Sequence, residues 1–432
     1  MREQQSRLTA IVGINWGDEG KGRMVDLLSE TYDVIIRYQG GNNAGHTVVN
    51  DKGKFILNLL PSGILRSTTV NVMGNGMVID LEHLVKEIKS LTDKGIQITP
   101  EHLKISEKAV ICMPYHKMLD CLEEDRLGDA KFGSTRRGIG PVYGDKYMKK
   151  VLRMGDLFES EAYLKERLSG ILEWRNLMIH NGYGAETVCA EDMYAWLREY
   201  GDALKPYICD VTAYLTKAIK DGKKILFEAQ LGALRDIDFG IFPYTSSSST
   251  IAAYAPVGAG IPFAKLDDTI GVIKAYSSCV GEGPFPCEMF GEEADRLRAA
   301  GGEYGAATGR PRRVGGFDIP ASKYGCLMQG ATELALTKLD VLSYFEKIPV
   351  CVGYEVDGKV YTDFIVGDKL NRAKPVYAYV DGFHCDISGC RKVLDLPKAA
   401  YEYIKYIEKA VGVPVTYVSV GADRDAYIKM YE

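Results

Sequence analysis

Short runs of apolar, mostly β-branched residues recur along the chain, and stretches with helical periodicity separate them. The runs have the length of buried strands, and Gly, Asn or Asp bound most of them. Strands that alternate with helices are typical of a largely parallel sheet with helices on both faces. Six runs predict strands: Thr9–Val12, Val34–Ile36, Val70–Met73, Ile225–Phe227, Ile270–Ile273 and Val415–Val420.

Apolar residues at helical spacing predict the helices between these strands. One stripe runs from Leu81 to Leu91, with Asp80 as a suitable N-cap and Gly95 as a suitable end. A second stripe covers Ala400–Val411 and is followed by glycine. A long helix is predicted from about Ser160 to Asn181.

Composition fits an ordered globular protein. The chain has 432 residues, of which 46% are hydrophobic and 26% charged. We find no internal repeat and no Pro- or Ser-rich linker, so we expect one elaborated α/β domain, 1–432, with insertions. The net charge of −5 and the lack of a basic stretch argue against a nucleic-acid partner or a membrane surface. No apolar run approaches the roughly 18 residues of a membrane helix.

The ten cysteines are scattered through the chain. The segment Met1–Thr9 is polar, and no apolar leader precedes the first strand, so we expect a cytoplasmic protein with reduced thiols. Cys385 and Cys390 lie close to His384, but no second pair has ligand spacing, which argues against a zinc site.

The segment Gly13–Arg23 carries the strongest chemical signal. It is rich in glycine, follows a predicted strand and precedes an amphipathic helix, a context in which backbone amides bind phosphate. It resembles a P-loop, with Lys21 for the outer phosphates, but Asn15 stands at the first Walker glycine and Gly22 at the Mg²⁺-binding Ser/Thr. Asp18 in such a loop would repel phosphate unless it holds a metal or acts as a base.

Three further loops extend this picture. The segment Tyr38–Thr47 is rich in glycine and amides and ends at His46, a candidate catalytic group. Lys338 and Asp340 form a TKxD element that resembles the guanine-reading element of GTP-binding proteins and favours guanine over adenine. The segment Gly305–Arg313 offers three arginines for carboxylate or phosphate. So many anion-binding loops on an acidic protein imply a substrate with several negative groups.

Taken together, these motifs resemble the adenylosuccinate synthetase family from near the first strand to the C-terminus. The resemblance implies a homodimeric α/β enzyme that joins L-aspartate to IMP with hydrolysis of GTP and with Mg²⁺. The matching segments are WGDEGKG (Trp16–Gly22), RYQGGNNAGHT (Arg37–Thr47), LPSGIL (Leu60–Leu65), RGIGP (Arg137–Pro141), GPFP (Gly283–Pro286), TGRPRR (Thr308–Arg313) and TKLDVL (Thr337–Leu342).

The resemblance also implies catalytic roles. Asp18 takes the N1 proton of IMP, so that O6 attacks the γ-phosphate of GTP and forms 6-phosphoryl-IMP. His46 donates to the transferring phosphoryl group, and Lys21 binds the phosphates. Mg²⁺ is held by Asp18 and the Gly45 carbonyl. The amine of aspartate then displaces phosphate from C6.

The binding residues follow from the same resemblance. For GTP they are Gly17, Glu19, Gly20, Lys21, Gly22, Arg23, Arg312, Lys338, Leu339, Asp340, Ser419, Val420 and Gly421. For IMP they are Asn15, Asp18, Asn43, Ala44, Gly45, Thr135, Lys149, Arg153, Gln230, Leu231, Ser246 and Arg310. For aspartate they are Ala306, Ala307, Thr308, Gly309, Arg310 and Arg312.

Two departures from the family pattern bear on substrate recognition. The amide that contacts the purine in the family falls at Leu231, and Gln230 stands one residue early. One residue reverses the facing in a strand, so either the contact is lost or a bulge redirects Gln230. Lys149 replaces the arginine that reaches the partner subunit's IMP, a point charge in place of a bidentate group.

Two alternatives to this ligase therefore stay open. One is an aspartate ligase for another 6-oxopurine nucleotide, which the altered Gln230–Leu231 segment would allow. The other is a GTP-binding regulatory protein without turnover. The presence of both Asp18 and His46 argues against the second alternative, because nucleotide binding alone needs neither group.

Overall fold

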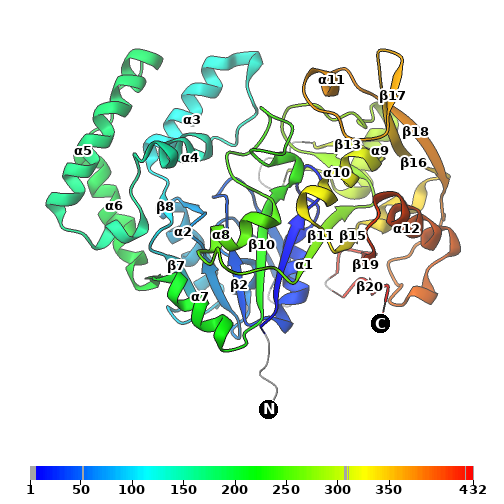
Figure 1. Ribbon diagram of the computed structural model, residues 1–432, viewed down its shortest axis with the longest axis horizontal. Helices are drawn as coiled ribbons and strands as arrows, with labels where there is room; N and C mark the ends of the chain where they lie inside the picture. The colour runs from blue at the N-terminus through cyan, green and yellow to red at the C-terminus, as the bar shows by residue number, and fades with distance from the viewer. Residues whose placement is uncertain (1–5, 51–52, 306–308, 310, 424, 432) are drawn as a thin grey trace.

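A ten-stranded, mostly parallel sheet forms the centre of the computed structural model, which describes residues 6–50, 53–305, 309, 311–423 and 425–431 (Figure 1). Only the pair β19–β20 at one edge is antiparallel. This arrangement confirms the predicted α/β class. In spatial order the strands are β20 (Tyr427–Lys429), β19 (Val415–Ser419), β15 (Glu333–Thr337), β11 (Asp268–Lys274), β1 (Leu8–Gly13), β10 (Ile225–Gly232), β2 (Val34–Arg37), β5 (Val70–Met73), β7 (Leu103–Ser106) and β9 (Ile208–Cys209).

All six predicted strands lie in this sheet, and their alternating residues pack on its two faces. Ala10 and Val12 belong to the core that contains residues of α7 (Val211–Lys220) and α8 (Ala255–Ala259). Ile11 belongs instead to the core on the opposite face, with residues of α1 (Lys21–Leu28). The central strands are therefore buried on both sides, which is why they read as continuous apolar runs.

The predicted helices are present. The helix α2 (Leu81–Thr92) begins at Asp80, whose carboxylate accepts from the His83 amide, and α12 (Lys398–Val411) ends at a glycine in the left-handed region. The long helical stretch predicted from about Ser160 to Asn181 is also present. It runs as α5 (Glu161–Leu177) and continues as a π-helical turn over Met178–Gly182.

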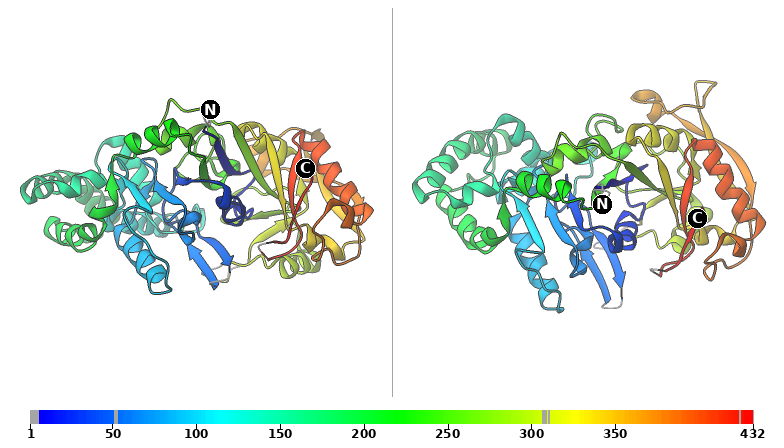
Figure 2. Two further views of the ribbon diagram at one scale, coloured as in Figure 1. Left: turned by 90° about the horizontal axis from the view of Figure 1, so that it is seen from below. Right: turned by 60° about the horizontal axis from the view of Figure 1, so that its bottom comes forward.

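Three additions surround the sheet, and of their elements the sequence patterns predicted only α5. A hairpin, β3 (His46–Asn50) and β4 (Gly53–Leu57), projects from the sheet as the blue pair of strands in Figure 2. A helical lobe contains α3 (Pro114–Leu127), α4 (Ile139–Met148), α5 and α6 (Ala190–Leu204), at the left of Figure 1. On the other side lies a second sheet with β14 (Phe317–Asp318), β16 (Lys347–Val356), β17 (Lys359–Tyr361) and β18 (Lys374–Asp381). The remaining elements are β6 (Val78–Ile79), β8 (Val110–Ile111), β12 (Ser277–Cys279), β13 (Arg313–Gly315), α9 (Gly291–Gly301), α10 (Ile319–Gln329) and α11 (Asp368–Asn371).

The parallel order places several loops at one edge of the central sheet. Because β19, β15, β11, β1, β10 and β2 run parallel to their neighbours, their carboxyl ends meet there. In open α/β sheets ligands bind at this edge, where strand order reverses. None of the helices in the described part of the chain has the length and apolarity needed to cross a membrane.

Asp80 caps α2 and also binds two side chains of other segments, so its loss should cost more stability than the loss of a simple cap. Its Oδ2 accepts from Asn42 Nδ2 and from Lys117 Nζ, each at 3.0 Å. We expect Asp80→Ala to lower the free energy of unfolding by about 1 kcal/mol for the lost cap, and by about 1–3 kcal/mol more for the buried amide left without an acceptor. Asp210→Ala, which removes the cap of α7, is the matched control. If urea unfolding shows that both variants lose the same free energy of unfolding, this account is contradicted.

Candidate active site

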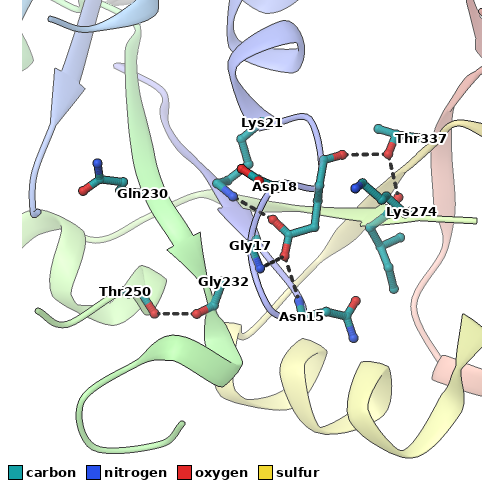
Figure 3. Close-up of polar contacts among 12 residues, drawn as sticks. Asn15, Gly17, Asp18, Lys21, Gln230, Gly232, Thr250, Lys274 and Thr337 are labelled. Carbon is teal, nitrogen blue, oxygen red and sulfur yellow. Dashed lines mark hydrogen bonds and ion pairs between the residues drawn. The ribbon is translucent and has the colours of Figure 1, made fainter. Parts of the chain in front are cut away.

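The loop between β1 and α1 is organised around the carboxylate of Glu19. This buried group accepts from the backbone amides of Asn15 at 3.1 Å and Gly17 at 2.8 Å. It also accepts from Lys21 Nζ at 2.7 Å, and Figure 3 shows these contacts meeting on one carboxylate. Glu19 therefore shapes the loop from inside. Lys21 is in place at the first residue of α1, where a phosphate would meet the positive end of the helix.

Neighbouring strands fix the position of this loop. A Cβ atom at Gly232 would lie 2.2 Å from the Asn15 carbonyl oxygen and 2.7 Å from Glu19 Oε1, so only glycine fits at the end of β10. On the other side, the Thr337 hydroxyl at the end of β15 donates to the Glu19 carbonyl at 2.7 Å. Figure 3 shows both strand ends beside the loop. The loop is thus held from two directions before any ligand binds.

Asp18 points out of this loop and remains accessible. Its φ of 59° lies in the left-handed region, and its side chain is 36% exposed. Arg312 Nη2 donates to Asp18 Oδ2 at 3.0 Å. This ion pair brings together two segments almost 300 residues apart in the sequence. The expected base and the expected aspartate-binding arginine are therefore neighbours.

His46 lies against the start of α1. A Cβ atom at Gly22 would be 2.9 Å from His46 Cβ, which explains why glycine replaces the usual Ser/Thr of a P-loop. The Nδ1 atom of His46 is 2.5 Å from Glu228 Oε1 on β10. The other oxygen of Glu228 accepts from the Ser62 amide at 2.8 Å. This buried support fixes the imidazole ring and directs its Nε2 side away from Glu228.

The electrostatics of this pair set the protonation of His46. Burial alone would raise the pKa of Glu228, but His46 and Arg37 lower it, so this carboxylate is ionised and accepts the Nδ1 proton. Burial lowers the pKa of His46 below its ordinary value, and the charge of Glu228 offsets only part of this effect. His46 is therefore neutral near pH 7 in the protein without substrates. The negative charge of a phosphate would raise the pKa of His46 and favour the proton on Nε2.

The guanine side of the site lies at the ends of β15 and β19. Lys338 follows β15 and donates through Nζ to the Gly301 carbonyl at 2.6 Å. Asp340 is half-buried, and burial raises its pKa. Arg23 of α1 donates to Ser419 Oγ at 2.9 Å and to the Gly421 carbonyl at 2.5 Å, so it holds the loop after β19.

Two of the residues expected at GTP belong to the core. The side chains of Leu339 and Val420 are completely buried among apolar residues. Their backbones lie in the guanine segments, so any contact with the nucleotide must come from main-chain atoms. Gly20 precedes α1 with a φ of 100°, a conformation that favours glycine at this N-cap.

The Gln230–Leu231 segment lies in a bulge of β10. Between Glu228 and Gly232 this strand contains two more residues than the facing segment of β1, and Leu231 takes a φ of 64°. Gln230 is buried, and its Nε2 donates to the Gly41 carbonyl at 2.9 Å. Its Oε1 atom has no hydrogen-bond partner among the described residues. The sequence left open whether the purine contact is lost or a bulge is present, and the structure contains a bulge. The amide of Gln230 reaches the loop after β2.

Other residues expected at IMP occupy the same loop or lie farther away. Asn43 Oδ1 accepts from the Gly41 amide at 3.2 Å, and the Ala44 carbonyl accepts from Asn58 at 3.1 Å. Ser246 Oγ is 3.0 Å from Ser248 Oγ. Asn15 turns its amide toward α10, where it donates to Ser322 at 3.2 Å. Three exposed residues lie around α4 in the helical lobe, without a contact to the phosphate loop in the described part of the chain: Thr135, Lys149 and Arg153.

Part of the expected aspartate-binding loop cannot be placed. Ala306, Ala307, Thr308 and Arg310 lie outside the described residues. Gly309 is exposed with a φ of 65°, and Arg312 anchors the end of the loop. Over the residues that the structure describes, including Cys385 and Cys390, no three His, Cys, Asp or Glu side chains gather in a way that could hold a metal.

The residues that the sequence did not predict are those that support the predicted site residues through hydrogen bonds. Glu228, Lys274 and Glu303 were not among the predicted site residues, and Ser62 appeared only within the segment Leu60–Leu65. Glu303 carried no local signal. All four are polar residues buried at strand ends or in adjoining loops. A charged residue that directly follows an apolar strand was the available signal for Glu228 and Lys274.

The fold and site together define a nucleotide-dependent enzyme of the α/β class. A phosphate loop, an acid–base pair and a lysine–aspartate element meet at the carboxyl edge of one parallel sheet. The family model of adenylosuccinate synthetase matches residues 10–428. Adenylosuccinate synthetase from Halothermothrix orenii is 46% identical over 97% of both chains, and that from Caldanaerobacter subterraneus subsp. tengcongensis is 44% identical over 98% of both chains.

Solved structures agree with these sequence matches. Fully ligated adenylosuccinate synthetase from Plasmodium falciparum superimposes with a TM-score of 0.91 and 36% identity, over 99% of this chain and 100% of that one. A succinoaminodeoxyadenylate synthetase from cyanophage S-2L has a TM-score of 0.62 at 19% identity, which shows a shared fold alone. The chain belongs to the adenylosuccinate synthetase family. It is therefore a GTP-dependent ligase that forms a C–N bond between aspartate and IMP.

The link between Glu228 and His46 can be tested by titration. We expect Glu228→Gln to lower the pKa of His46 further, because the carboxylate is the group that raises it against the effect of burial. The measurement is a ¹⁵N NMR titration of labelled histidines, with His46 assigned from the spectrum of His46→Asn. In the wild-type protein, added GDP should shift the titration midpoint of His46 to higher pH. A midpoint that rises in Glu228→Gln would contradict the proposed electrostatics.

Proposed function

We propose that the residues at this sheet edge join L-aspartate to IMP in two chemical steps, with GTP as the phosphoryl donor and adenylosuccinate, GDP and phosphate as products. The observation that carries this proposal is the convergence of Asp18 and His46 on one phosphate loop. Asp18 lies in the loop itself, and His46 lies against Gly22 at the start of α1. Nucleotide binding alone requires neither an exposed carboxylate nor a supported imidazole there.

The 6-oxo group of a purine is a poor leaving group, so the first step must activate it. Asp18 accepts the N1 proton of IMP, and the electron pair moves to O6. O6 then attacks the γ-phosphorus of GTP, the bond to the β-phosphate oxygen breaks, and GDP leaves. His46, held through Nδ1 by Glu228, donates from Nε2 to the phosphoryl oxygens. Lys21 stabilises the same negative charge from the start of α1.

In the second step, the amine of aspartate attacks C6 and phosphate leaves. Arg312, with Thr308 and Arg310 of the same loop, binds the aspartate carboxylates. Arg312 is paired with Asp18 when no substrate is bound. An arriving carboxylate competes for this arginine, so binding of aspartate changes the charge next to the base.

Strand order supports this arrangement of substrates. From β19 and β15 to β1 and then to β10 and β2, the edge carries the guanine segments, the phosphate loop and the Gln230–Asn43 region in turn. A GTP molecule laid along this edge presents its γ-phosphate between the loop and the segment that follows β2. The purine of IMP would lie there, beside the bulge at Leu231.

The residues present also fit Mg²⁺. Asp18 offers an accessible carboxylate and Gly45 an exposed backbone carbonyl, both hard oxygen donors of the kind that Mg²⁺ prefers. We infer that these two groups would hold the ion. The ion supplies neutralisation of charge between the phosphates.

We further propose that the chain is one domain, works as a homodimer and resides in the cytoplasm. Lys149 lies exposed at the end of α4, beside exposed Tyr147 and Met148, a surface suited to a second copy that receives Lys149 at its IMP site. The ten cysteines form no disulfide, as expected for a reducing compartment.

The activity is tested by a product assay with Mg²⁺, aspartate and GTP. We expect adenylosuccinate and GDP from IMP, no product from GMP or XMP, and loss of at least about a thousandfold in kcat for Asp18→Asn, since the base that activates O6 is gone. Arg136→Gln, on an exposed residue bonded to Asp125, is a control that should retain activity. Turnover of GMP or XMP in place of IMP would assign this chain to a different 6-oxopurine nucleotide.

The role of Lys149 across the dimer is tested by mixing two impaired variants. Asp18→Asn lacks the base, and Lys149→Ala lacks the residue that serves the partner's site. In a mixed dimer, one site keeps its own Asp18 and receives an intact Lys149. Equal mixing should therefore recover about a quarter of wild-type activity, given symmetric interfaces. Activity that stays at the sum of the separate variants would show that Lys149 does not act across the interface.

A further inference from the structure

A completely buried carboxylate, Glu303, lies between the guanine side and the aspartate side of the site. Its exposed fraction is 0%, and four donors surround it. Lys274 Nζ donates at 2.7 Å and Lys338 Nζ at 2.8 Å, both to Oε1. Arg312 Nη1 donates to Oε2 at 2.9 Å, and the Tyr276 hydroxyl donates to Oε1 at 2.5 Å.

The backbone of Glu303 also closes the loop that carries the expected aspartate-binding residues. The Arg312 amide donates to the Glu303 carbonyl at 2.9 Å, and Tyr304 pairs with Pro311 in an antiparallel bridge. Glu303 and Arg312 thus form the two ends of the base of this loop. The side chain and the main chain of Glu303 hold the same arginine.

These contacts form a continuous path between the two sides of the site. Lys338 follows β15 on the guanine side and is one-third exposed. Glu303 binds Lys338 through one oxygen and Arg312 through the other. Arg312 then uses its second terminal nitrogen to hold Asp18 at 3.0 Å. The path therefore runs from the guanine-reading lysine to the catalytic base through one carboxylate.

The charges in this cluster are not balanced. Lys274, Lys338 and Arg312 supply three positive charges, and Glu303 and Asp18 supply two negative ones. Burial alone would raise the pKa of Glu303, but Lys274 and Lys338 lower it well below its ordinary value, so the carboxylate is ionised. Buried ion clusters contribute little to net stability, because desolvation offsets their attraction. Their arrangement next to an anionic substrate site calls for a functional explanation.

We propose that Glu303 is a positioning residue that fixes Lys338 and Arg312 in one geometry and so couples the guanine site to the aspartate site. This inference rests on the proposed function. Loss of the carboxylate removes one constraint from each cation and leaves Lys338 with the Gly301 carbonyl and Arg312 with Asp18. The affinities for GTP and aspartate then fall together, although Glu303 touches neither substrate. IMP binds mainly beside β10 and β2 and meets this path only through Asp18, so we expect its binding to change least.

The experiment compares Glu303→Gln with Glu288→Gln in the ligase assay. Glu288 is the matched control, because it pairs with Arg313, the residue after Arg312, through Arg313 Nε at 2.8 Å. For Glu303→Gln we expect KM for GTP and KM for aspartate each to rise about tenfold through loss of charge-assisted hydrogen bonds, and KM for IMP to change by less than about twofold. Glu288→Gln should leave all three unchanged.

Lys338→Met provides a second test that leaves Glu303 intact, should Glu303→Gln fail to fold. It removes a one-third exposed side chain on the guanine side. Under the proposal it raises KM for aspartate by about threefold or more, besides raising KM for GTP, because Glu303 and Arg312 lose one of their constraints. A Lys338→Met variant whose KM for aspartate equals that of wild type overturns the coupling.

The outcomes separate this inference from the proposed function. A wild-type protein that forms no adenylosuccinate contradicts the proposed function itself. An active wild type with a folded Glu303→Gln variant whose KM values are unchanged overturns the role of Glu303 alone. An equal rise in all three KM values, together with a lower melting temperature, would show general damage to the fold and would also overturn it.

Discussion

The site depends on one constraint: the central strands are parallel, so their carboxyl ends lie along a single edge. Most segments that carry expected chemistry lie at or after one of these ends, from Ser419 at the end of β19 to His46 beyond β2. Strand order then converts positions far apart in the sequence into an ordered row of subsites. Two groups of expected residues are exceptions: the aspartate-binding loop comes from the segment between α9 and β13, and Thr135, Lys149 and Arg153 lie around α4. Among the described residues, Arg312 ties the aspartate-binding loop to the row through its bonds to Asp18 and Glu303.

Three buried glutamates organise the chemistry at this edge, and each holds a different kind of group. Glu19 binds loop amides and Lys21, Glu228 binds His46, and Glu303 binds Lys338 and Arg312. A buried carboxylate is costly unless it is fully hydrogen-bonded, and these three have at least three donors each. Their partners are therefore held rigidly before substrates arrive. Preorganisation of this kind reduces the reorganisation needed during reaction.

Local signals made much of this structure predictable. Continuous apolar runs located six strands, because buried parallel strands need no polar face, and Asp80 marked the start of α2 through its capping side chain. Motifs located Asp18, Lys21 and His46. The mixed sheet around β16 was missed. Its strand β18 is partly exposed and lacks such a run, and the apolar run of β16 contains a proline, which argues against a strand. The supporting glutamates were missed for another reason: a residue such as Glu303 acquires its role only from Lys274 and Lys338, which folding brings from elsewhere in the chain.

The bulge in β10 shows how packing between distant segments determines the local backbone conformation. Glu228 and Gln230 are two residues apart in a strand, so they share a face, and both reach the segment after β2, at His46 and Gly41. The next residue must then turn the chain so that Gly232 meets Asn15 and Glu19 without a side chain in the way. Leu231 makes this turn at a φ of 64°, a costly conformation for a branched side chain. The packing of the phosphate loop against Gly232 compensates for that strain, so the turn falls after Gln230 and leaves its amide on the face that Glu228 also uses.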